Sequence, residues 1–154
     1  MRNKALEYEV REWCSTYLLV NEDLLNIEKR IWIEGYFTLS NKVLSISKHV
    51  SNRRKKDLQK GLSKSDQHIH FILIGHLGKY IAETSEDHQQ KSKLHMEELL
   101  NEAFGVIYEV KERIVCNCVL VECKELENLC HLYETYGFKR LQNDKALIQY
   151  FKII

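Results

Sequence analysis

Two continuous apolar runs separated by a long amphipathic segment constrain the fold of this chain more than any other feature. The first run is Phe71-Ile72-Leu73-Ile74, and the second is centred on Val119-Leu120-Val121. Short, unbroken apolar runs are typical of strands buried on both faces of a sheet. Between them, apolar residues recur at spacings of three and four, which predicts a helix: Met96, Leu99, Leu100, Ala103, Phe104, Ile107 and Val110. The sequence therefore predicts a parallel strand–helix–strand unit.

The first third of the chain shows a different pattern, with short segments of branched and aromatic residues separated by polar turns. These segments predict antiparallel strands over 15–20, 31–33, 36–39 and 43–46, preceded by a helix over 4–14. Gly35 lies between the second and third of these strands, where it is expected to interrupt them or to mark a bulge. After the strand–helix–strand unit, we expect a helix over 125–136 that stops at Gly137. A closing pair of antiparallel strands is expected to turn near Asn143-Asp144.

Composition limits the class of protein. A chain of 154 residues suits a single domain over residues 1–154. Its formal charge of +1 gives no global attraction to nucleic acid or membrane. No apolar run approaches the roughly 20 residues that span a bilayer, and the first residues lack an apolar signal core. We therefore expect a cytoplasmic protein with no membrane contact.

The five cysteines predict free thiols rather than a metal site. They are Cys14, Cys116, Cys118, Cys123 and Cys130. Cys116 and Cys118 have no matching pair of histidines or cysteines downstream, which a zinc site needs. No metal is expected.

The order of these elements resembles that of the GNAT acetyltransferase superfamily. The segments that carry the resemblance are Phe71–Lys79 (FILIGHLGK), Glu98–Ala103 (ELLNEA), Leu132–Phe138 (LYETYGF) and Gly35–Ser40 (GYFTLS). The resemblance covers nearly the whole chain, and the Tyr-x-x-x-Gly-Phe ending is its most specific motif. It implies a mixed, mostly antiparallel central sheet with one splayed parallel strand pair, flanked by helices, in an α/β (α+β) fold.

The resemblance implies acetyl-CoA as co-substrate. In the family, the pantetheine arm pairs with the backbone of the first parallel strand, and the pyrophosphate binds free amides at the start of the next helix. The implied cofactor-binding residues are Ile74, Gly75, His76, Leu77, Gly78, Lys79, Lys91, Ser92, Lys93, Leu94, His95, Met96, Asn128 and Tyr133. The family's turn before the helix is Gln or Arg, two residues, Gly, one residue, Gly. Here Lys91 takes the first position, while Leu94 and Met96 replace the glycines.

The resemblance also implies the catalytic groups. Tyr133, by its place in the Tyr-x-x-x-Gly-Phe ending, is the expected general acid, and a backbone amide near Leu77 or Gly78 would hold the oxyanion. Glu122, near the end of the second parallel strand, is the candidate general base. His70, His76 or a bound water are alternatives to it.

The expected function is N-acetyl transfer from acetyl-CoA to a primary amine of a small molecule, a protein or an aminoacyl-tRNA. The alternative is a non-catalytic acyl-CoA-binding or regulatory module with a degenerate GNAT fold. In either case we expect a monomer or a homodimer. The basic segment with Arg53, Arg54, Lys55, Lys56 and Lys60 is either a solvated surface or a phosphate contact. The phosphate would belong to a tRNA backbone or to the 3′-phosphate of coenzyme A.

Overall fold

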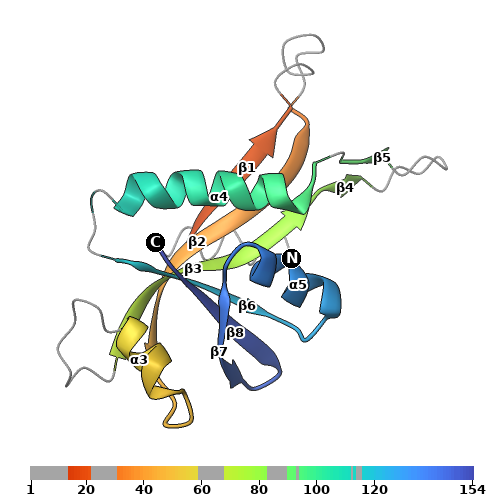
Figure 1. Cartoon of the computed structure of the whole chain (residues 1–154). Coiled ribbons are helices and arrows are strands. Elements are labelled where there is room, and N and C mark those ends of the chain that lie inside the picture. Colours follow the sequence, from red (N-terminus) through yellow and green to blue (C-terminus); the bar gives the residue numbers. More distant parts are fainter. Residues whose placement is uncertain are drawn as a thin grey trace. The chain divides into compact units, whose positions relative to one another are not determined.

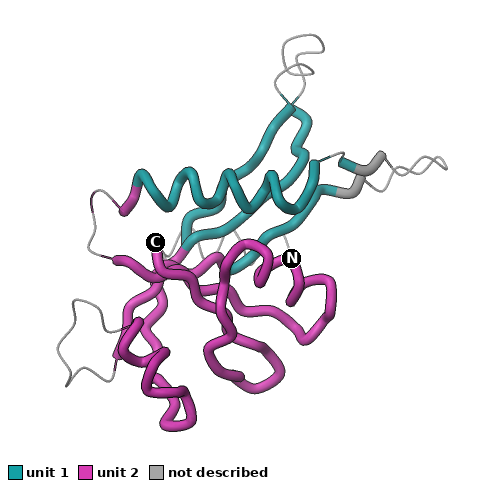
Figure 2. The backbone as a smooth tube through the Cα atoms, viewed as in Figure 1, with its two compact units in different colours: residues 1–39, 75–109 teal, residues 40–74, 110–154 magenta. Residues whose placement is uncertain are grey.

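The computed structural model describes residues 14–21, 31–58, 68–82, 90–92, 94–111, 113 and 116–154 (Figure 1). The backbone divides into two compact units (Figure 2). Unit 1 comprises residues 1–39 and 75–109, and unit 2 comprises residues 40–74 and 110–154. The expectation of a single domain stays a prediction.

The described elements are strands and helices in mixed order. The strands are β1 (Ser15–Val20), β2 (Ile33–Ser45), β3 (His68–Lys79), β4 (Ile81–Ala82), β5 (Gln90–Lys91), β6 (Cys118–Cys123), β7 (Lys139–Asp144) and β8 (Leu147–Ile153). The helices are α3 (Asn52–Leu58), α4 (Met96–Lys111) and α5 (Glu127–Thr135). Hydrogen bonds order six strands as β1-β2-β3-β6-β8-β7, and β4 pairs separately with β5.

The strand directions confirm the predicted fold class. β3 and β6 run parallel, whereas β1 with β2, β6 with β8, and β7 with β8 are antiparallel. The sheet is therefore mixed and mostly antiparallel, with one parallel pair and flanking helices. The parallel ladder is short, because it joins only Ile72, Leu73 and Ile74 to Val119, Leu120 and Val121.

Unit 2 has a continuous apolar core. Its buried residues come from five strands, from α3 and from the segment before α3: Leu44, Val50, Leu58, Ile69, Phe71, Cys118, Leu120, Leu141 and Phe151. Leu58 at the end of α3 and Leu141 on β7 belong to this one cluster. The short helix α3 and the strand β7 are thus anchored to the same core, although they are distant in sequence.

Unit 1 buries one face of α4 and fits it closely to β2. Leu99, Leu100, Ala103, Phe104 and Ile107 are buried along the helix. A Cβ atom built on Gly35 would lie 2.9 Å from Leu94 Cδ2 and 3.2 Å from Leu99 Cδ1. Gly35 therefore allows side chains at the start of α4 to approach the backbone of β2.

Most of the expected elements are confirmed, with shifted boundaries. The strand over 15–20, both parallel strands, the helix from Met96 and the helix before Gly137 are present. β2 is one continuous strand through Gly35, but the expected bulge lies beside this glycine, because the pairing with β1 skips from Leu19↔Gly35 to Val20↔Ile33. The last hairpin turns at Lys145-Ala146, directly after the expected Asn143-Asp144. Lys145 takes a φ of 54°, as a tight hairpin turn requires. The helix expected over 4–14 lies almost wholly outside the described residues, which begin at Cys14.

Candidate functional site

Tyr133 is held by the way in which α5 ends. The Phe138 amide donates to the Tyr133 carbonyl at 3.0 Å, and the Gly137 amide donates to the Glu134 carbonyl at 2.9 Å. Gly137 has a φ of 82°. These two hydrogen bonds and the left-handed residue form a Schellman motif. The Tyr-x-x-x-Gly-Phe ending therefore fixes the position of Tyr133 through the backbone.

The Tyr133 ring lies in a buried aromatic cluster of unit 2. Its centroid is 5.6 Å from that of Phe138 and 6.3 Å from that of Tyr150. Burial, with a smaller contribution from the Cys123 thiol, raises the pKa of Tyr133 to about 12. The phenol is therefore protonated at neutral pH, which is the state that a proton donor needs.

Glu122 is part of a hydrogen-bond network rather than a free carboxylate. Its oxygens accept from Lys42 Nζ at 2.6 and 2.7 Å, and Oε1 also accepts from Gln149 Nε2 at 2.6 Å. Gln149 is fully buried, and its Oε1 accepts from Gln142 Nε2 at 3.0 Å. Glu122 thus accepts hydrogen bonds from the buried side-chain amide of Gln149 and balances the charge of the Lys42 ammonium group. Lys42 and Gln149 carry no sequence signal that would have linked them to Glu122.

In unit 1, the second half of β3 fits closely against β2. The His76 amide donates to Thr38 Oγ1 at 2.8 Å, and a Cβ atom on Gly75 would lie 3.0 Å from the same oxygen. A Cβ atom on Gly78 would lie 3.0 Å from the Tyr36 ring. Both glycines therefore make room for side chains of β2. This packing explains the glycines at these two positions without a bound ligand. Leu77 and Lys79 are half-buried on the same strand.

The start of α4 satisfies two of its own amides. The Leu94 amide donates to Ser92 Oγ at 3.1 Å, and the His95 amide donates to Glu98 Oε2 at 2.5 Å. Helix N-termini bind anions through such amides. Here, two of the amides expected to bind the pyrophosphate already donate hydrogen bonds to side chains. Lys93 and the Lys91 side chain lie outside the described residues.

The remaining predicted cofactor residues lie in unit 2. Ile74 is buried at the end of the parallel ladder, opposite Val121. Asn128 is exposed at the start of α5, where its Oδ1 accepts from the Leu129 amide at 3.0 Å. A hollow of about 620 Å³ surrounds this end of the helix, lined by Leu126, Glu127, Asn128 and His131.

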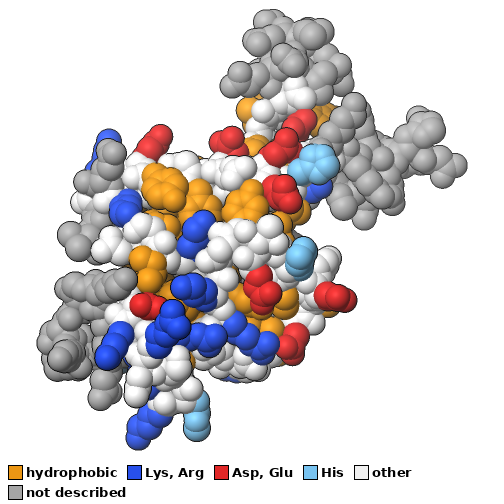
Figure 3. Space-filling model, in the orientation of Figure 1, with side chains coloured by type: hydrophobic (Ala, Val, Ile, Leu, Met, Phe, Trp, Pro, Cys, Tyr) orange, Lys and Arg blue, Asp and Glu red, His pale blue; other side chains and the backbone are white. Residues whose placement is uncertain are grey.

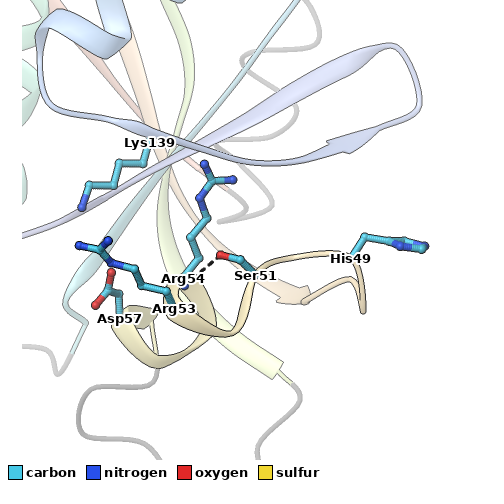
Figure 4. Close-up of a pocket in the computed structure, with 6 residues that line it drawn as sticks. All are labelled: His49, Ser51, Arg53, Arg54, Asp57 and Lys139. Atoms are coloured by element: carbon cyan, nitrogen blue, oxygen red, sulfur yellow. Dashed lines mark hydrogen bonds between the residues drawn. The ribbon is translucent and has the colours of Figure 1, made fainter.

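The predicted basic segment is confirmed as a short surface helix, α3, in the part that the structure describes. In Figure 3, Lys and Arg side chains gather on the surface that carries α3 and the start of β7. A cavity of about 530 Å³ lies there (Figure 4), lined by His49, Ser51, Arg53, Arg54, Asp57 and Lys139. Lys139 comes from β7 and was not predicted, because its position depends on the packing of Leu141 and Leu58.

Among the described residues, no group of three or more His, Cys, Asp or Glu side chains is placed to hold a metal ion. No described helix is long and apolar enough to cross a membrane.

Solved structures of bacterial toxins share this architecture over almost the whole chain. AtaT complexed with acetyl-methionyl-tRNAfMet is 16% identical, with a TM-score of 0.66 over 96% of this chain and 75% of that chain. A KacT mutant with one tyrosine changed to phenylalanine is 17% identical, with a TM-score of 0.63 over 94% of this chain and 74% of that one. The chain has the GNAT fold. AtaTR bound with acetyl-CoA is 16% identical, with a TM-score of 0.62 over 96% and 74% of the two chains. No protein-family model matches the chain, and no curated protein matches its sequence.

Proposed function

We propose that this protein is an N-acetyltransferase that moves the acetyl group of acetyl-CoA to a primary amine. The observation that carries the proposal is the GNAT fold, which AtaTR bound with acetyl-CoA shares. Tyr133 supports it, because the end of α5 fixes this residue through the backbone hydrogen bonds of Gly137 and Phe138. We further propose that the protein acts in the cytoplasm.

The reaction is a direct transfer. The neutral amine attacks the thioester carbonyl carbon, a C–N bond forms, and the C–S bond breaks as the tetrahedral intermediate collapses. Tyr133 donates its proton to the departing thiolate of coenzyme A. The amine loses its proton to a base, and a proton from solvent returns the tyrosinate to its phenol form, so that the protons balance over one turnover. A backbone amide of Leu77 or Gly78 stabilises the oxyanion of the intermediate.

Coenzyme A is proposed to bind through the backbone of β3 and the start of α4. The β3 groups are those of Ile74 to Lys79, and the α4 groups are those of residues 91–96. Asn128 at the start of α5 is a further proposed contact. Leu94 replaces a family glycine, and its side chain packs toward Gly35. This packing offers a reason why a leucine is tolerated at that position.

Glu122 remains a candidate general base, but its hydrogen bonds favour another role. Both of its oxygens already accept from Lys42 or Gln149. A carboxylate engaged in this way is a poor acceptor for the proton of a passing amine. We therefore propose that a bound water, or His70 or His76 on β3, takes the proton.

Among the acceptor classes, an aminoacyl-tRNA is favoured by one comparison. The AtaT structure contains acetyl-methionyl-tRNAfMet, the acetylated form of such an acceptor. A small amine and a protein amine remain the other candidates. The non-catalytic alternative predicts binding of an acyl-CoA without turnover.

Thermal unfolding with acetyl-CoA tests the proposal. A ligand present at one hundred times its dissociation constant stabilises a protein by about 2.7 kcal/mol, which is several degrees for a domain of this size. We expect such a shift with acetyl-CoA and none with acetate. The absence of a shift at millimolar acetyl-CoA refutes the acetyltransferase assignment. A shift without release of free coenzyme A, across a panel of small amines and aminoacyl-tRNA, supports the non-catalytic alternative.

A further inference from the structure

We propose that the cavity between α3 and β7 binds phosphates of an RNA backbone. This inference rests on the proposed function in one respect: the RNA is taken to carry the amine that is acetylated. We call this cavity the α3–β7 pocket. It is defined by His49, Ser51, Arg53, Arg54, Asp57 and Lys139, all of which belong to unit 2.

The lining of the pocket is mainly cationic. Three permanent cations, Arg53, Arg54 and Lys139, line one cavity together with a single carboxylate, Asp57 (Figure 4). No ion pair joins these cations to another described residue, although Arg140, next to Lys139 on β7, pairs with Glu125 at 3.3 Å. Like charges that share a cavity repel one another unless an anion lies between them. The pocket therefore favours an anionic ligand.

The backbone that carries the pocket is held in place by the core of unit 2. α3 is held at its start by Ser51, whose Oγ accepts from the Arg54 amide at 3.4 Å. Its end is fixed by Leu58, which is buried in the same core as Leu141 of β7. The bases of the Arg53 and Arg54 side chains are thus positioned by the fold, so less entropy is lost when a ligand binds.

The side chains of the pocket favour phosphate over other anions. Guanidinium groups bind phosphate oxygens in a bidentate manner and are well suited to nucleic-acid backbones. The pocket is open and lies on a surface where exposed Lys and Arg side chains gather (Figure 3), which suits a long polyanion better than an enclosed small molecule. No aromatic side chain lines it, so it offers no stacking for bases. The expected contact is therefore with phosphates and independent of base sequence.

The affinity for deacylated bulk tRNA, measured over a range of salt concentrations, tests the inference. For duplex RNA as for DNA, the logarithm of the affinity falls with the logarithm of salt concentration by roughly 0.9 for each phosphate contact. The double variant Arg53→Ala/Arg54→Ala is expected to bind at least tenfold more weakly at about 0.15 M salt, with a slope smaller by about 2. Lys139→Ala is expected to lower the slope by about 1.

Two matched variants distinguish binding in the pocket from a general effect of the protein's positive surface charge. Lys56 lies exposed on the same helix but does not line the pocket, so Lys56→Ala should change the affinity less than twofold. Asp57→Asn removes the one carboxylate of the pocket and should strengthen binding several-fold. An equal loss from Lys56→Ala and from Arg53→Ala overturns the inference, as does tRNA binding that Arg53→Ala/Arg54→Ala leaves unchanged.

Acetyl-CoA binding by the same variants tests the other source of phosphate, because coenzyme A also carries a 3′-phosphate. Arg53→Ala/Arg54→Ala should bind acetyl-CoA as the unchanged protein does. Weaker acetyl-CoA binding with normal tRNA binding assigns the pocket to the cofactor and overturns the inference. If acetyl-CoA fails to bind at all while tRNA binding follows the expected pattern, the proposed function fails and the RNA site stands.

Discussion

The carboxylate of Glu98 accepts a hydrogen bond from the backbone amide of His95 at 2.5 Å. The pair closes the first turn of α4, and the amide of the preceding residue, Leu94, donates to Ser92 Oγ. A side chain that reaches back to an amide before the helix is a typical N-terminal cap. It also places a negative charge where the proposed function needs the pyrophosphate of coenzyme A.

The first prediction follows from this competition. Glu98→Ala should bind acetyl-CoA about two- to fivefold more tightly, since it frees one amide and removes a charge worth roughly 0.3–1 kcal/mol near a helix N-terminus. The same change should lower the free energy of unfolding by about 1 kcal/mol, because a cap is lost. Titration calorimetry and urea unfolding measure the two effects. Glu102→Ala, one turn later and exposed, is the control. An unchanged affinity of Glu98→Ala for acetyl-CoA would show that the Glu98 carboxylate does not compete with the pyrophosphate.

The start of α4 also shows where sequence reasoning stops. Helical spacing from Met96 to Val110 and the apolar runs predicted the elements, because burial of one face or of both faces leaves a period in the sequence. The Gly-Phe ending predicted the stop of α5, because a positive φ at Gly137 is a local requirement. The packing of Leu94 on Gly35 has no such local signal, since it joins residues far apart in the chain. Lys139 in the α3–β7 pocket was missed for the same reason.

The second prediction compares two glycines of unit 1. Gly35→Ala places a Cβ atom 3.2 Å from the Gly78 carbonyl oxygen, a backbone atom that cannot easily move, and 2.9 Å from Leu94 Cδ2. Overpacking of this kind costs about 1–3 kcal/mol. Gly105, inside α4, has nothing within 4 Å of its Cβ position, so Gly105→Ala should stabilise the protein by about 0.5–1 kcal/mol. Urea unfolding of both variants measures the difference, and equal effects contradict the close fit.

The third prediction concerns stability at high pH. Burial raises the pKa of Tyr133 from 10.0 to about 12, and those of Cys118 and Cys123 from 9.0 to about 11. The folded state holds these protons more tightly than the unfolded chain does. The stability they contribute is therefore present below pH 9 and is lost as the pH rises from 9 toward 12.

Urea unfolding across this pH range, with tyrosinate absorbance as a second signal, measures the loss. Tyr133 alone should account for roughly 2–3 kcal/mol between its two pKa values. Tyr133→Phe should remove that part of the fall above pH 10 and keep the part that begins near pH 9. A wild-type stability that is flat up to pH 11 contradicts the burial of these groups.

The fourth prediction separates two roles of Glu122. Glu122→Gln keeps an acceptor for Gln149 Nε2, whereas Glu122→Ala leaves that buried amide without a partner. An unsatisfied buried group costs about 1–3 kcal/mol, so the alanine variant should be the less stable of the two. If Glu122 has a structural role, Glu122→Gln retains most of the turnover. A loss of 10²-fold or more in turnover by Glu122→Gln, at unchanged stability, identifies Glu122 as the general base.

The last prediction tests Tyr133 as the proton donor. Tyr133→Phe removes one hydroxyl and keeps the ring that packs against Phe138 and Tyr150. It also keeps the backbone hydrogen bond from Phe138, so the end of α5 is preserved. Loss of a general acid lowers turnover by roughly 10²–10⁴-fold.

Steady-state release of free coenzyme A and titration calorimetry with acetyl-CoA separate chemistry from binding. We expect the phenylalanine variant to lose turnover while its affinity for acetyl-CoA changes less than about twofold. Tyr150→Phe is the matched control, because Tyr150 lies in the same aromatic cluster and its hydroxyl donates to Glu134 at 3.0 Å. Equal losses in both variants point to packing rather than proton transfer. Full turnover in Tyr133→Phe would show that the Schellman motif has only a structural role and that another group donates the proton.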